Sequence, residues 1–311
     1  MKYSEKQPPI TCIQRHSTCY QGTTRFTPRG ILWHDTDAGN PYISRYVQPH
    51  ETDADYEEKL ALLGKNRYGN DWNHKPRQAG MNAFIGKLAD GTVASVQTMP
   101  WNYIPWGCGA GKKGSLNGAC LQFEICDDGY ESEAYFRQVY EEACQLTAYL
   151  CQLFDLDPLG TFVYNGVEVP VITSHAESYK LKLGGNHGDP LKWLKKFGKT
   201  MEDVRRDVAA LLRGKEWTDA PAPAPETKPD HDPVQSGYAL TMRILQKGCE
   251  GDDVKALQQL LTANDCAADP DGIFGPKTEE AVEKYQVKVE LPVDGAAGPQ
   301  VMGSLLGAKT T

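Results

Sequence analysis

The chain has 311 residues, of which 40% are hydrophobic and 24% are charged, and these values are typical of an ordinary globular protein. Its length is sufficient for two domains. The formal net charge of -8 argues against nonspecific nucleic-acid binding, and the lack of an apolar run of about 18 residues argues against a membrane span.

The first residues carry no apolar segment, so we expect no Sec-type signal peptide and predict a protein that is held in the cytoplasm. The chain contains nine cysteines, an odd number, and none of them forms a C-x-x-C pair. Without an export signal, the expected state of most of them is a reduced thiol that is buried as a small apolar group.

The region up to residue 214 alternates between patterns of strands and patterns of helices. Buried or alternating runs predict strands at 30–34, 81–87, 92–97, 120–126 and 169–174. Asp90 and Gly91 predict a hairpin between the second and third of these strands. Apolar residues at helical spacing predict helices at 132–154 and 200–212, the latter capped by Thr200. We therefore predict a mixed α/β domain over residues 1–214, with a mixed central sheet flanked by helices.

A linker is expected at residues 215–237, because its centre is rich in Pro and Ala and lacks apolar periodicity. The remaining residues, 238–311, are predicted to form a small domain. It contains two D-G-x-x-G-P turns, which begin at Asp271 and Asp294. Helices are expected at 252–264, at 278–287 and after Pro299, so the small domain should be a compact three-helix unit.

Candidate metal ligands occur at His34, His175 and Asp189. Both histidines stand at the end of a predicted strand, and the loop after His175 must fold back to bring Asp189 close. Two histidines and one carboxylate are a ligand set of catalytic zinc, which keeps one position open for water. The alternative for each histidine is a hydrogen-bonded side chain of the core.

Glu124 lies in the middle of a predicted strand, where a charged group is costly unless it is paired or functional. One interpretation is a general base whose pKa is raised by burial and which takes a proton from metal-bound water. The other is a carboxylate on the solvated face of the strand. Three interpretations of His187 are open. It is a metal ligand in competition with Asp189, a hydrogen-bond donor to the oxyanion that forms on carbonyl attack, or a histidine of a surface loop.

Two further motifs are weak. The segment Gly111-Lys-Lys-Gly-Ser115 lacks the glycine before the Gly-Lys pair and the Ser or Thr after it that a phosphate-binding loop requires. Ser174 and His175 are neighbours and would point to opposite faces of a strand, which argues against a Ser/His hydrolase.

The motifs around these residues resemble those of the zinc-dependent N-acetylmuramoyl-L-alanine amidases of type 2. That fold is shared by phage lysins, bacterial autolysins and peptidoglycan recognition proteins. The resemblance covers roughly residues 25–212, and its most specific part is Asn186-His-Gly-Asp-Pro190 together with the upstream histidine. The remaining matching segments are 31–36, 84–92, 121–125, 174–177 and 193–200.

The resemblance implies that His34, His175 and Asp189 bind zinc and that Glu124 is the acid/base residue. His187 fills a place that Lys or His takes in the family, two residues before the last ligand. Asn186 and Trp106 are the candidates for substrate binding. Many relatives carry Trp-His before a glycine near the middle of the domain, whereas this chain reads Ile104-Pro-Trp-Gly-Cys108.

Segments of the small domain resemble the three-helix peptidoglycan-binding domain of type 1. The matching segments are 248–261, 271–278 and 291–295. Within the first of them, the spacing of Val254, Leu257, Leu260 and Leu261 predicts residues of the core.

The combined expectation is a hydrolase that cleaves the amide between N-acetylmuramic acid and L-alanine of the stem peptide, with peptidoglycan as both substrate and anchor. We expect a phage or prophage endolysin that stays in the cytoplasm until its release to the cell wall during lysis. An autolysin of the bacterium itself is an alternative. A peptidoglycan-binding protein without catalysis, a peptidase and a glycosidase also stay open, and a glycosidase would use paired carboxylates and no metal.

Overall fold

The computed structural model describes residues 9–214 and 244–305. The chain divides into two compact units, 1–217 and 218–311, which are described separately. The predicted linker at 215–237 lies outside the described residues, and the predicted domain boundaries stay predictions. No helix within the described ranges is long and apolar enough to cross a membrane.

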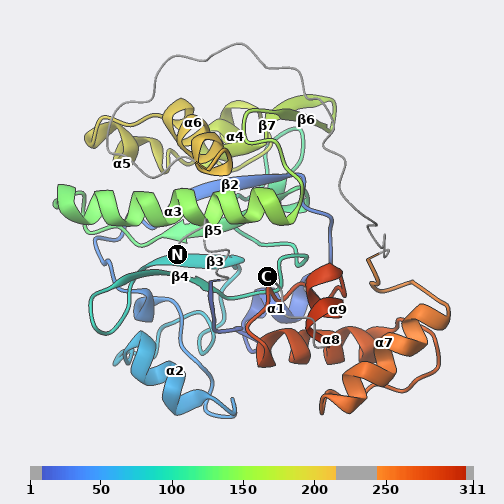
Figure 1. Ribbon diagram of the computed structural model, residues 1–311. Helices are drawn as coiled ribbons and strands as arrows, with labels where there is room; N and C mark the ends of the chain where they lie inside the picture. The colour runs from blue at the N-terminus through green and yellow to red at the C-terminus, as the bar shows by residue number, and fades with distance from the viewer. Residues whose placement is uncertain (1–8, 215–243, 306–311) are drawn as a thin grey trace. The chain divides into compact units, whose positions relative to one another are not determined.

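The large unit is a mixed α/β structure built on a six-stranded sheet (Figure 1). Its strands are β1 (Ile10–Thr11), β2 (Gly30–Asp35), β3 (Ala83–Lys87), β4 (Val93–Gln97), β5 (Cys120–Ile125) and β8 (Ile172–Ser174). They lie in the order β1-β4-β3-β5-β2-β8, and only β3 and β4 are antiparallel to each other. A separate two-stranded sheet joins β6 (Thr161–Tyr164) to β7 (Val167–Pro170). The predicted mixed sheet and the β3–β4 hairpin are confirmed.

Six α-helices and two short 3₁₀ helices of the described residues belong to this unit. They are α1 (Thr18–Gly22), η2 (Ile43–Arg45), α2 (Tyr56–Leu63), η3 (Leu116–Gly118), α3 (Glu133–Leu153), α4 (His175–Lys180), α5 (Leu191–Lys196) and α6 (Met201–Leu212). The predicted cap of α6 is confirmed, because the Thr200 side chain accepts a hydrogen bond from the Asp203 N–H in a capping box.

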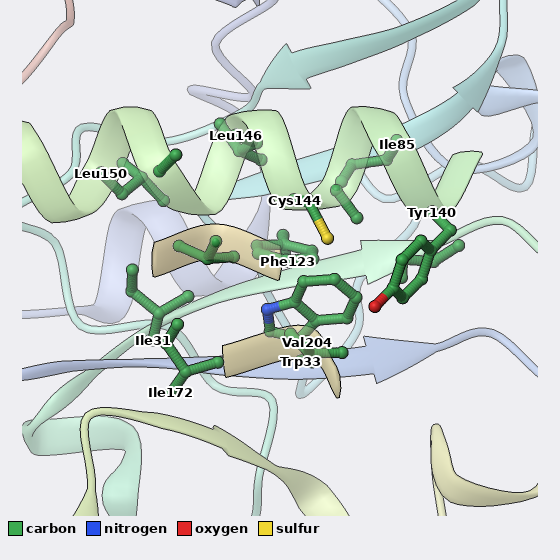
Figure 2. Packing of buried hydrophobic residues seen from close by; sticks show 14 of the residues in the cluster. Ile31, Trp33, Ile85, Phe123, Tyr140, Cys144, Leu146, Leu150, Ile172 and Val204 are labelled. Carbon is green, nitrogen blue, oxygen red and sulfur yellow. The ribbon is translucent and has the colours of Figure 1, made fainter. Parts of the chain in front are cut away.

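One face of the sheet is covered by α3 and α6, and this interface forms the main hydrophobic core (Figure 2). Trp33 of β2 and Phe123 of β5 point into it and meet Tyr140 and Leu146 of α3. Trp33 is fully buried, yet its Nε1–H donates to Thr147 Oγ1 at 3.1 Å, so burial leaves no polar group unpaired there.

The prediction of one continuous strand at 169–174 is wrong. The segment is divided into β7, which pairs with β6, and β8, which joins the main sheet beside β2. His175 is the first residue of α4 and does not end a strand. The reason is local: Pro170 has no N–H for a ladder, and Ser174 with Glu177 forms a capping box that starts a helix.

Alternation along the strands sends the polar residues to the opposite face of the sheet. His34 lies one residue after Trp33, so its side chain points away from α3. The hydrophobic residues on this second face belong to two smaller clusters, one around Phe84 and Val96 and one around Leu32. The candidate site therefore lies on the face of the sheet that α3 does not cover.

The small unit contains α7 (Asp252–Ala263), α8 (Pro276–Lys288) and α9 (Pro299–Leu305) around one core, which confirms the three predicted helices. Its two D-G turns are held in the same way. Gln258 of α7 donates to Asp271 and accepts from the Gly272 N–H, and Gln286 of α8 repeats both bonds with the turn at Asp294. The glycine in each turn has a positive φ, which explains why both turns need it.

All nine cysteines are free thiols, and eight of them are buried, as predicted. Burial raises the pKa of Cys19 and Cys151 to about 12, so these thiols stay protonated at neutral pH.

Replacing Leu146 with Ala should destabilise the large unit by about 2–5 kcal/mol, because a fully buried side chain leaves a cavity between α3 and the sheet. All six tryptophans lie within residues 1–217, so denaturant unfolding followed by tryptophan fluorescence reports on this unit alone. The matched control is Gln138→Ala on the exposed face of α3, which should change stability by less than about 0.5 kcal/mol.

Candidate active site

Three side chains that are far apart in sequence converge at the ends of β2 and β8. His34 Nδ1 lies 3.0 Å from Asp189 Oδ2 and 3.1 Å from His175 Nδ1, which lies 3.2 Å from Asp189 Oδ1. Ligand atoms around a tetrahedral zinc, at about 2.0–2.1 Å from the ion, are separated by about 3.3 Å. The predicted set is thus brought together at nearly the spacing that a dication requires.

Strand pairing and one helix start place these residues. Trp33 pairs with Ser174 across β2 and β8, so the next residues, His34 and His175, stand side by side. The Ala176 N–H at the start of α4 donates to the backbone oxygen of Asp189 at 3.0 Å, which fixes the third side chain beside the first two.

A chain of hydrogen bonds decides the tautomer of His34. Asn117 Oδ1 accepts from the backbone N–H groups of Gly107 and Cys108, so it is an acceptor, and Gln122 Nε2 also donates to it at 2.9 Å. Gln122 Oε1 therefore faces His34 Nε2 at 2.9 Å and accepts its proton. The Nδ1 atom of His34 is left with a lone pair that points at Asp189.

His175 completes this arrangement. Its Nε2 is buried and has no hydrogen-bond partner among the described residues, while its Nδ1 faces His34 and Asp189. His34 Nδ1 and Asp189 Oδ2 thus lie at hydrogen-bond distance although neither atom carries a proton to donate to the other. Such a set of acceptors fits a bound cation.

Negative charge is concentrated around this point. Burial pushes the pKa of Asp189 upward, but when His175 and His34 are protonated their hydrogen bonds and charge outweigh it and hold the pKa well below its usual value. Burial, together with the charges of Asp189 and Asp127, raises the pKa of Asp35 to about 7. A positive ion between the ligands would relieve this repulsion.

Glu124 lies on the same face of the sheet as the triad. It is the register partner of His34 across β2 and β5, and of Phe84 across β3 and β5. Its Oε2 is buried and has no hydrogen-bond partner in the described parts of the chain. Burial raises the pKa of Glu124 well above its usual value, and the charges of Asp189, Asp35 and Asp127 add to the effect. The side chain as a whole is half-buried, and its role as an acid/base residue stays a prediction.

His187 stands at the outer edge of the site. Its ring stacks on His175 with a centroid distance of 4.6 Å, its Nδ1 lies 3.9 Å from Asp189 Oδ1, and its side chain is 67% exposed. His187 is thus outside the closely spaced triad, and it is accessible to a ligand. Asn186 beside it is also exposed.

Trp106 is half-buried, and its ring packs closely over Gly22 at the end of α1. The next residue, Gly107, passes so near Gln122 that a Cβ there would clash with its Oε1. The segment therefore borders the site, while the Trp106 ring has a packing role. Substrate binding by Trp106 and Asn186 stays a prediction, as do the roles of the remaining site residues.

Two positioning residues were missed from the sequence. Gln122 lies two residues before Glu124, and the alternation of a strand could have placed both on the face of His34. Arg205 of α6 binds both carboxylate oxygens of Glu177 at 2.7 and 2.8 Å and so supports the helix start at His175. No local pattern in the sequence marks this contact, because 28 residues separate the pair.

Comparison with known protein families gives two matches. The family described as N-acetylmuramoyl-L-alanine amidase matches residues 26–192, and the one described as putative peptidoglycan binding domain matches residues 250–305.

Individual proteins show similarity to parts of the chain. A probable N-acetylmuramoyl-L-alanine amidase of Bacillus licheniformis is 28% identical over 64% of this chain and 49% of that protein. A spore cortex-lytic enzyme of Bacillus cereus is 38% identical over 22% of this chain and 27% of the enzyme. The chain thus spans half or less of these two relatives. The crystal structure of Staphylococcus aureus hydrolase AmiA with its ligand aligns with a TM-score of 0.39 and 21% identity. The alignment covers 62% of this chain and 81% of the AmiA chain.

Replacing Glu124 with Gln should make the metal-free protein more stable at neutral pH. A folded-state pKa above the usual 4.5 means that the wild type keeps its full stability below about pH 4.5 and loses it as pH rises toward the folded pKa. The variant lacks this loss. Its free energy of unfolding should therefore exceed that of the wild type by about 1.4 kcal/mol more for each pH unit across that interval.

Urea unfolding with a chelator, at a series of pH values, measures this difference. The control is Glu131→Gln, the same change at an exposed position that leaves no buried carboxyl to desolvate. A difference between Glu124→Gln and the wild type that stays constant with pH would contradict the raised pKa.

Proposed function

Since this chain belongs to the N-acetylmuramoyl-L-alanine amidase family, we propose that it is a zinc-dependent hydrolase that cleaves the amide between N-acetylmuramic acid and L-alanine of the peptidoglycan stem peptide. The observation that carries this proposal is the convergence of His34, His175 and Asp189 at 3.0–3.2 Å beside Glu124, whose Oε2 is buried. The second matching family supports peptidoglycan as the polymer that is bound.

The three converging side chains would hold the zinc ion, and Gln122 would keep His34 in the tautomer whose Nδ1 binds. When bound, zinc polarises the carbonyl of the substrate and makes water a better nucleophile at neutral pH. The proton transfers and the hydrogen bond to the oxyanion are carried out by side chains of the protein.

Glu124 Oε2 accepts a proton from the attacking water as its oxygen forms a bond with the amide carbon. The C–N bond then breaks, and Glu124 gives the proton to the nitrogen of L-alanine, which leaves as an amine. Burial suits Glu124 to both steps, because a raised pKa lets the carboxyl hold the proton between them. His187, exposed at the rim, donates a hydrogen bond to the oxygen that becomes negative during attack.

We also propose the role of an endolysin of phage or prophage origin, held in the cytoplasm until lysis and acting at the wall. The pairing of an amidase with a peptidoglycan-binding domain supports a role in wall degradation. An autolysin of the bacterium itself is the alternative. Detection of the intact protein outside unlysed cells would favour the autolysin.

Digestion of purified Gram-positive sacculi tests the reaction. The wild type should release stem peptides that begin with free L-alanine, identified by mass spectrometry. Glu124→Gln should lower the rate by about 10²–10⁴-fold, because the proton acceptor is lost, and a chelator should abolish release. Glu131→Gln is the matched control and should retain full activity.

The products distinguish an amidase from a glycosidase and from a binding protein. New reducing sugar ends, insensitive to chelator, would indicate a glycosidase. Binding to sacculi without release of peptides or sugars would indicate a wall-binding protein without catalysis.

Removing residues 215–311 should lower the rate on intact sacculi and leave the rate on a soluble muropeptide unchanged. The small unit raises the local concentration of the catalytic unit only when the substrate is a polymer that both can engage. The ratio of the two rates, measured by release of L-alanine amino termini, checks this. An equal loss on both substrates would show that the small unit serves folding or catalysis instead of anchoring.

A further inference from the structure

A second group of potential metal ligands lies in the large unit, outside the candidate active site. His50, Glu51 and His74 each offer one ligand atom, and the three atoms lie within 4.8 Å of one another. The carboxylate oxygen is 3.3 Å from His74 Nε2 and 3.7 Å from His50 Nε2. These separations are close to the value of about 3.3 Å between ligands of a tetrahedral zinc.

His74 is oriented as metal-binding histidines usually are. Its Nδ1 lies 2.8 Å from Asp71 Oδ1, and the side chain of Asp71 is only 2% exposed. The same oxygen accepts the backbone N–H groups of Asn73 and His74, which fixes the carboxylate in place. With Nδ1 held by Asp71, Nε2 is the atom that faces Glu51, and a metal ion would take the place of the proton shared between Nε2 and Glu51 Oε2.

His50 is held in the same region by different contacts. Its Nδ1 accepts the Thr52 backbone N–H at 3.3 Å and lies 2.8 Å from Thr52 Oγ1, and these two contacts orient the ring. Metal binding through Nε2 would require the ring proton to move to Nδ1, where Thr52 Oγ1 can accept it. The His50 ring is nearly parallel to that of His74, at 5.5 Å, and stacks on that of His16, at 3.6 Å. His16 supports the ring without adding an atom to the ligand group.

We propose that His50, Glu51 and His74 form a second divalent-metal site of the zinc class, separate from the candidate active site. Imidazole and carboxylate ligands favour Zn²⁺ and its neighbours over Mg²⁺ or Ca²⁺, which prefer oxygen alone. Three protein ligands leave the remaining position to water. An exposed ion pair alone would contribute little here, because solvent screens it.

The site would join two loops that lack regular structure. His50 and Glu51 precede α2, and His74 belongs to the segment 71–74, so a bound ion would cross-link the two. Trp72 of that segment packs on Tyr46 and Phe84, with ring centroids 6.2 and 5.1 Å apart. Phe84 is the register neighbour of Glu124, so the cross-link would stiffen a layer of the core that adjoins the catalytic strand.

Zinc binding by the full chain tests this site. After equilibrium dialysis against Zn²⁺ alone, we expect about two zinc ions per wild-type chain and about one for Asp189→Ala, which lacks a ligand of the first site. In the Asp189→Ala background, His74→Gln or Glu51→Gln should remove the remaining ion. Glu58→Gln in the same background is the matched control, an exposed carboxylate outside the ligand group, and should keep it.

Thermal unfolding followed by tryptophan fluorescence is the second readout. Zinc should raise the midpoint of Asp189→Ala and of its Glu58→Gln derivative, and this rise should be lost with Glu51→Gln. Glu51 is 63% exposed, so its replacement does not disturb the core. Zinc uptake by Asp189→Ala that neither Glu51→Gln nor His74→Gln lowers would overturn the proposal, as would the absence of bound zinc from Asp189→Ala. Neither outcome depends on the proposed activity, since the test does not use the substrate.

Discussion

The hydrogen bond between His34 Nε2 and Gln122 Oε1 is the contact on which the candidate active site depends. It removes the Nε2 proton from competition and turns the Nδ1 lone pair toward Asp189 and His175. The orientation of Gln122 is itself set by Asn117, which two backbone N–H groups identify as an acceptor. The tautomer of His34 is thus set by two backbone N–H groups, which act through Asn117 and Gln122.

This network requires a sheet whose two faces differ. On one face, Trp33 and Phe123 pack against α3 and make β2 and β5 rigid. On the opposite face, the neighbouring residues His34, Gln122 and Glu124 carry polar groups, one of which has a buried oxygen with no partner in the described residues. The stabilisation from the apolar face offsets the cost of holding a carboxylate away from water on the polar face.

Much of this could be predicted from the sequence, because the signals were local. The periods of two and 3.6 residues indicated the strands and the long helix, and the Asp90-Gly91 pair indicated the hairpin. His34, His175 and Asp189 were singled out by residue type, and their convergence depends on a parallel pairing of β2 with β8. The sequence did not predict the break at Pro170, since the apolar pattern of 169–174 continues through it. Contacts between distant residues, such as Arg205 with Glu177 or His74 with Glu51, leave no local pattern.

The burial of the cysteines has a consequence for metal selectivity. Thiolates are softer and stronger zinc ligands than imidazole or carboxylate, and nine of them would compete for every ion that enters the protein. Eight of the thiols are buried, and burial raises the pKa of Cys12, Cys120, Cys126 and Cys144, among others. In the folded chain, most of the thiols are therefore inaccessible to a metal ion, whereas imidazole and carboxylate groups stay accessible. An unfolded chain would expose all nine, so zinc present during refolding would bind the unfolded state as well and hinder the recovery of the native protein.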